Sequence, residues 1–182
     1  MKIIFPDLAS KRCLPSYVFF VLLAYQLNSC SSETSPPPKY LRWVGDIAFD
    51  PKTDKKDFHL CDADDIKQYH NFSFGFLYKG EKIALEKEIR EQYNAQNVAA
   101  QSGWLRIRFI VNCQGETDRF RIIGMDENRK PQTFDKSISD QLLNITKRLK
   151  GWLILPDDET PGDYYIYLIF KLDNGKIKEI MP

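Results

Sequence analysis

The sequence lacks the features that mark several large functional classes. Its 26 Lys and Arg residues are balanced by 25 Asp and Glu residues, so the net charge is only +1. A protein that binds nucleic acid usually presents a clustered basic surface, and this balance therefore argues against nucleic acid as a partner. The chain also has no Gly-rich loop of the kind that binds phosphate groups.

Support for catalysis is missing as well. A nucleophilic side chain needs a neighbouring base, but the chain has only 2 His residues, and its serines fall in the signal, the linker or helix caps. Candidate metal ligands occur, but their spacing fits no standard zinc pattern. These candidates are His59, Cys61, Asp62, Asp64, Asp65 and His70. We therefore expect no catalytic residue, no metal, no cofactor and no small-molecule substrate.

The N-terminus carries an apolar stretch, Leu14 to Leu27, that follows Lys11 and Arg12 and ends shortly before Cys30. This layout is typical of a bacterial lipoprotein signal, in which the cysteine is lipidated and becomes the first residue. As a helix the stretch would be about 21 Å long, short of the ~30 Å hydrocarbon core of a bilayer. We expect a signal peptide over residues 1–29 and lipidation of Cys30. An uncleaved membrane anchor is the alternative.

A linker and an irregular segment follow the signal. Residues 30–39 are rich in Pro and Ser, and three consecutive prolines favour an extended polyproline II geometry. Residues 40–76 are rich in aromatics without a regular pattern, apart from a short helix expected over Ala63 to Tyr69. The length left after the signal suits one domain plus a tail.

Two cysteines remain beyond the signal, Cys61 and Cys113. In an oxidising compartment outside the cytoplasm they are candidates for one disulfide. Such a bridge would stabilise the fold by about 4 kcal/mol on the chain-entropy model. Two buried free thiols are the alternative.

Residues 77–182 show helix and strand patterns in turn. Leu85, Ile89 and Tyr93 recur at a spacing of four, which indicates an amphipathic helix. The next two segments, Trp104 to Asn112 and Arg119 to Met125, read as an antiparallel hairpin. We expect four arginines of this hairpin to share one face: Arg106, Arg108, Arg119 and Arg121. Such a face meets either an acidic partner or solvent and neighbouring carboxylates.

The final part of the chain predicts another helix and two strands. The helix follows Pro131, the first strand covers Tyr164 to Leu172, and Ile177 to Ile180 forms a short last strand after a turn. The apolar stripe of the helix consists of Phe134, Ile138, Leu142, Ile145 and Leu149. We expect an α+β domain with the order α-β-β-α-β-β, in which two helices cover an antiparallel sheet of three to four strands.

Several short motifs recur in this order. They are Tyr78-Lys79-Gly80, the strand from Gly103 to Asn112, Gln114-Gly115-Glu116, Phe120 to Gly124, Gly151-Trp152 and residues 164–170. The ordered set, over residues 77–182, resembles the C-terminal domain of TonB-family proteins. Together with the lipoprotein signal, Asn112-Cys113-Gln114-Gly115 looks like proteins of the Bacteroidetes group. The chain departs from the family at Tyr93-Asn94, where Tyr-Pro is frequent, and in the spacing between Trp152 and Pro156.

The resemblance implies a module that binds other proteins by strand addition, as when an extended segment of an outer-membrane receptor pairs with a sheet edge. The edge that it implies is Tyr164 to Leu172. Aromatic and apolar side chains late in the chain are therefore expected to contact the partner, unless the N-terminal segment packs over them. These are Trp152, Tyr164, Tyr165, Tyr167 and Ile169.

Three functions fit these observations. The first is a lipid-anchored binding module in the bacterial cell envelope, with its domain in the periplasm or at the cell surface. The second is a TonB-like energy transducer for transport through outer-membrane receptors, which requires the N-terminal helix to stay uncleaved. The third is a structural lipoprotein whose sheet edges are plugged by residues 40–76.

Overall fold

The computed structural model describes residues 47–69, 75–155 and 161–181. The predicted signal peptide, Cys30 and the linker lie outside these residues. The described residues belong to one compact unit that comprises Gly45–Pro182. Within them, no helix is long and apolar enough to cross a membrane.

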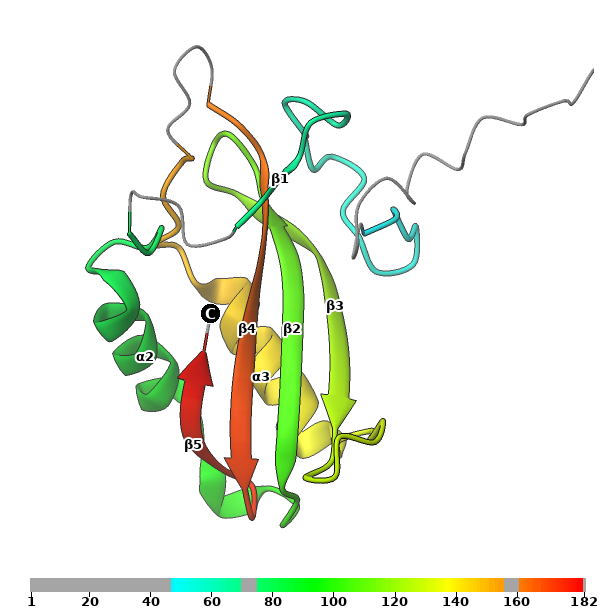
Figure 1. The fold of residues 1–182 in the computed structure, drawn as a ribbon, viewed down its shortest axis with the longest axis vertical. Helices are drawn as coiled ribbons and strands as arrows, with labels where there is room; N and C mark the ends of the chain where they lie inside the picture. Colours follow the sequence, from blue (N-terminus) through cyan, green and yellow to red (C-terminus); the bar gives the residue numbers. More distant parts are fainter. Residues whose placement is uncertain (1–46, 70–74, 156–160, 182) are drawn as a thin grey trace, which may run out of the picture. The chain divides into compact units, whose positions relative to one another are not determined.

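Over the described residues the domain is α+β, with five strands and two helices (Figure 1). In chain order the elements are β1 (Lys67–Gln68), α2 (Glu81–Gln92), a 3-10 turn (Ala95–Asn97), β2 (Gly103–Val111), β3 (Thr117–Met125), α3 (Lys136–Arg148), β4 (Tyr164–Asp173) and β5 (Lys176–Met181). The sheet order is β1-β4-β2-β3, and β5 pairs with the same side of β4 as β1 does. The α+β class agrees with the sequence analysis, and so does the element order from α2 onward.

The sheet is mixed, which corrects the expectation of a purely antiparallel sheet of three to four strands. The additional strand is β1, which pairs in parallel with Tyr164 and Tyr165 of β4. It comes from the segment expected to be irregular. A strand of two residues carries no alternation that could be recognised in the sequence.

The helix predicted over Ala63 to Tyr69 is wrong. The side chain of Asp62 accepts a hydrogen bond from the backbone N–H of Asp64 at 2.9 Å, which stabilises a turn, and the chain then extends into β1. Asp side chains compete with the helix for backbone donors in this way. Pairing with β4 then supplies the partners that a helix would have provided.

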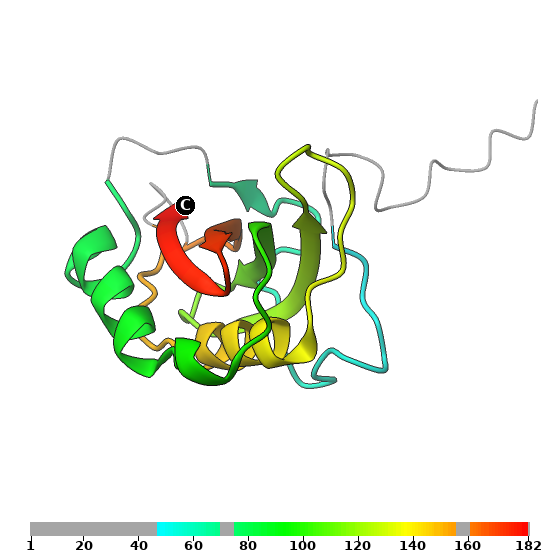
Figure 2. The same ribbon diagram turned by 90° about the horizontal axis from the view of Figure 1, so that it is seen from below.

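The main core lies between the sheet and the two helices, which cover one face (Figure 2). Leu105, Ile107 and Phe109 alternate along β2 and face this core, as the period of a half-buried strand requires. The helices contribute Leu85, Ile89, Ile138, Leu142 and Ile145.

Helix α3 has clear end signals. The side chain of Asp135 accepts a hydrogen bond from the N–H of Ser137 at 2.8 Å, which caps the first turn. Lys147 and Arg148 lie in the last turn, where positive charge complements the helix dipole. These signals define the ends of the helix, which contacts β3.

Candidate binding edges of the sheet

The edge implied by the resemblance, along β4, is covered at both ends. At its start, the N–H of Lys67 donates to the carbonyl of Asp163 at 2.9 Å, and the N–H of Tyr69 donates to that of Tyr165 at 3.0 Å. At its other end, β5 pairs with β4 from Ile169 onward. Between these two strands only residues 166–168 have no paired neighbour among the described residues on that side. This gap is too short for a bound segment of normal strand length.

Three of the five side chains expected to contact a partner are buried. The Trp152 ring packs against Phe109, with ring centroids 5.1 Å apart. Tyr164 is fully buried, its hydroxyl donates to the carbonyl of Leu153 at 2.8 Å, and burial raises its pKa. Tyr165 is 5% exposed. These residues stabilise the core, so they do not form a recognition surface in this conformation.

The other two, Tyr167 and Ile169, lie on the sheet face opposite the helices. Tyr167 is 37% exposed, and Ile169 is partly buried. In the register of β4 and β2, Ile169 is opposite Arg106 and Tyr167 is opposite Arg108. Arg108 is buried and donates to the side chain of Gln68, so it is part of the internal packing.

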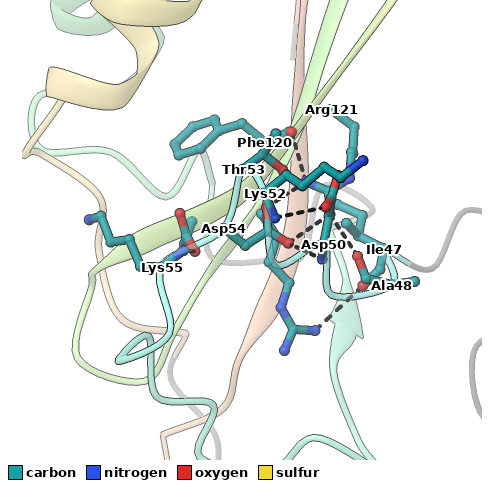
Figure 3. A network of polar contacts seen from close by, with 11 residues as sticks. Ile47, Ala48, Asp50, Lys52, Thr53, Asp54, Lys55, Phe120 and Arg121 are labelled. Atoms are coloured by element: carbon teal, nitrogen blue, oxygen red, sulfur yellow. Dashed lines mark hydrogen bonds and ion pairs between the residues drawn. The ribbon is translucent and has the colours of Figure 1, made fainter.

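Residues 47–55 are attached to β3 by a polar network (Figure 3). Arg121 donates two hydrogen bonds to the carboxylate of Asp54, both at 2.7 Å, and a third to the carbonyl of Ala48. Burial alone would raise the pKa of Asp54. The hydrogen bonds and charge of Arg121 lower this pKa, and so does the hydrogen bond from the N–H of Asp50, so that the net shift is downward. The hydrogen bond to Asp54 raises the pKa of Arg121. Asp54 therefore remains ionised at neutral pH, and its segment is part of the domain.

The structure joins Cys61 and Cys113 in a disulfide, with their Cα atoms 6.1 Å apart. Beside it lies the fully buried carboxylate of Asp163. That carboxylate accepts hydrogen bonds from the backbone N–H groups of Cys61 at 2.7 Å, Asp62 at 3.0 Å and Cys113 at 2.9 Å. A buried charge needs this kind of compensation. No pattern in the sequence indicates that Asp163 holds these segments together.

The second edge of the sheet is β3, and no strand of the described residues pairs with its centre on the outer side. The N–H of Gln132 donates to the carbonyl of Gly124 at 3.0 Å, which shows that the backbone groups of Gly124 face outward. Since orientation alternates along a strand, those of Ile122 face outward too. Turned away from β2 in this way, the N–H and C=O of Ile122 have no hydrogen-bond partner outside the strand ladders among the residues that the structure describes.

A pocket of about 280 Å³ lies beside this open stretch, between β3 and the start of α3. The residues that line it are Ile122, Gly124, Gln132, Thr133, Phe134 and Ser139. On the other face of the same strand, Ile123 is 49% exposed. Two neighbouring isoleucines place apolar side chains on both faces of an edge strand. That pattern was the available sequence signal for this open stretch, and the expectation of an edge along β4 overlooked it.

Comparison with protein-family models, with curated proteins and with solved structures finds no match to this chain.

Proposed function

We propose that this chain is a lipid-anchored protein-binding module of the bacterial cell envelope, and that β3 is the strand to which its partner adds. The observation that carries this proposal is the outward-facing N–H and C=O of Ile122 beside the pocket at Phe134. An edge strand offers main-chain hydrogen bonds to any extended segment, and a neighbouring pocket selects among segments by their side chains. The resemblance to TonB-type domains supports the binding mode, although it implies a different edge.

The pocket and the charges around it define the partner segment. It is an extended segment of another protein, with one apolar side chain that enters the pocket and further side chains that contact Ile123 on the opposite face. The ammonium of Lys147 lies 5.5 Å from the centre of the Phe120 ring, near the beginning of the open stretch. An acidic side chain at that end of the segment would complement this charge.

The anchor is part of the same proposal. Lipidation at Cys30 would hold the domain at a membrane surface, and stable attachment needs more than one acyl chain. Such an anchor keeps the domain close to membrane proteins without connecting it to a motor on the far side of the bilayer. Binding without force transduction is therefore the function that we favour over an energy transducer.

A structural lipoprotein without a ligand is the second candidate. Its support is the coverage of β4, since β1 from the N-terminal segment and β5 from the C-terminus close most of that edge. Natural proteins cover sheet edges in this way to avoid unwanted pairing. The open stretch of β3 is what separates the two candidates.

Filling the pocket tests the proposed function. A photoreactive amino acid at Ile123 is expected to form a specific adduct in native membranes, and Ser139→Trp, which fills the pocket from α3, is expected to abolish that adduct. Ser139→Ala is the matched control, because it leaves the pocket open, and it should keep the adduct. Adducts of equal yield in both variants would contradict binding through the pocket, and no adduct in the protein that keeps Ser139 would favour the structural lipoprotein.

A further inference from the structure

Strand β1 occupies β4 in the way that a bound segment would occupy a sheet edge. It is the only parallel strand in the described sheet, and its main chain supplies the hydrogen bonds from Lys67 and Tyr69 described above. The residues on either side of β1 pack against the two faces of the sheet. Ile66 packs with Ile110 and Tyr165 on one face, and Tyr69 joins the main core on the other. This is strand addition by a segment of the same chain.

The same segment is held by a covalent bond close to β1. The disulfide connects Cys61, six positions before Lys67, to Cys113 at the end of the β2–β3 hairpin. Asp163 forms hydrogen bonds both with the two cysteines of the disulfide and with β1. Its carboxylate binds the N–H groups of Cys61 and Cys113, and its main-chain carbonyl binds the N–H of Lys67. Detachment of β1 therefore requires the separation of groups that the disulfide keeps together.

We propose that residues 62–69 are an internal occupant of a second strand-addition site on β4, and that the Cys61–Cys113 disulfide is the latch that keeps them there. With the latch open, the site takes an extended segment of another chain. That segment pairs in parallel with β4 and places an apolar side chain where Ile66 now lies. The device is an autoinhibitory contact, and it does not depend on the proposed function of β3.

A dithiol reductant opens the latch by thiol–disulfide exchange. Cys61 is exposed and Cys113 is partly buried, so the incoming thiolate attacks the sulfur of Cys61. The sulfur of Cys113 leaves as a thiolate and takes up a proton. The second thiol of the reductant then displaces Cys61, which also ends as a thiol, and the reductant becomes a disulfide after transferring two electrons.

Hydrogen exchange on the full chain in detergent micelles tests whether the disulfide holds the strand. After reduction with dithiothreitol, or in the double variant Cys61→Ser and Cys113→Ser, the amides of Lys67 and Tyr69 should exchange about tenfold faster or more. The amide of Leu168, which pairs with β2, should keep its rate. Unchanged exchange at Lys67 and Tyr69 would overturn the proposal, and so would an equal increase at all three amides.

A peptide probe tests whether the vacated edge is a binding site. The probe is a labelled peptide with the sequence of residues 62–69, and its control carries N-methyl groups at Lys67 and Tyr69, which remove the two donors. The probe should bind the reduced protein and not the oxidised protein, and the control should bind neither. Equal binding to both redox forms would contradict the latch.

A second variant keeps the test decisive if the double variant does not fold. Lys67→Pro removes one main-chain donor of β1 and leaves the disulfide intact. After reduction it should bind more probe than the reduced unsubstituted protein does, because its own β1 competes less well, and equal binding would overturn the proposal. Substitutions on β3 should not affect any of these results, so failure here is distinguishable from failure of the proposed function.

Discussion

Replacement of Arg121 by Met is expected to destabilise the domain by about 2 kcal/mol. Met retains the apolar stem of the side chain, so the loss reports mainly on the charged group. A hydrogen bond to a charged group contributes about 1.5–3 kcal/mol, and loss of one partner of a fully buried pair costs about 3–5 kcal/mol. The side chain of Asp54 is 1% exposed but that of Arg121 is 30% exposed, so solvent screens the pair and the lower range applies.

The assay is urea unfolding followed by tryptophan fluorescence, with Asp54→Asn and the double variant completing a thermodynamic cycle. The coupling energy should be about 1.5–2 kcal/mol at pH 7. Because the folded-state pKa of Asp54 is lowered, its stabilising effect is complete above the unfolded-state pKa of about 3.9 and is lost as the pH falls through the folded value. The difference between the unsubstituted protein and Arg121→Met should therefore shrink below about pH 4. A coupling energy below about 0.5 kcal/mol that does not change with pH would refute the role given to this pair.

Two further stability predictions use matched controls in the same unfolding assay. Asp163→Asn should lower the free energy of unfolding by about 1–3 kcal/mol, because the amide oxygen cannot accept hydrogen bonds from all three backbone N–H groups that the carboxylate binds. Its control, Asp140→Asn on the exposed side of α3, should change that free energy by no more than about 0.5 kcal/mol. Gly124→Ala should lower the free energy of unfolding by about 1–3 kcal/mol, because the added Cβ would lie 2.2 Å from the carbonyl oxygen of Gln132. Its control, Gly162→Ala, should leave that free energy nearly unchanged, because the nearest atom to its Cβ would be 3.7 Å away. A loss at Asp140 or Gly162 as large as at its counterpart would contradict these explanations.

The regular part of the fold was predictable because its signals are local. Leu85 and Ile89 are buried on α2 at the predicted spacing, and the alternation of β2 places Leu105 and Ile107 in the core. The hairpin turn was also predictable, with Gly115 at a φ of 77° where a left-handed conformation is required.

Which edge of the sheet is free was not predictable, because the exposure of a strand depends on partners that are distant in sequence. Tyr165 alternates with its neighbours like a side chain at a surface, but Arg108 lies over its ring at 4.5 Å and β1 covers its backbone. The position of β3 at the end of the sheet order is likewise a property of the assembled sheet. Long-range pairing therefore decides which strand edge is free, and it leaves no local signal in the sequence.

The most direct test of strand addition at β3 is the loss of one main-chain donor. Ile122→Pro removes the outward-facing N–H without breaking a hydrogen bond to β2, and proline is tolerated at such edge positions. Ile122→Val keeps the N–H and is the control. With the photoreactive group at Ile123, the account predicts that the proline variant loses the adduct in native membranes while the valine variant retains it. Retention of the adduct by a folded proline variant would contradict binding through the main chain of β3.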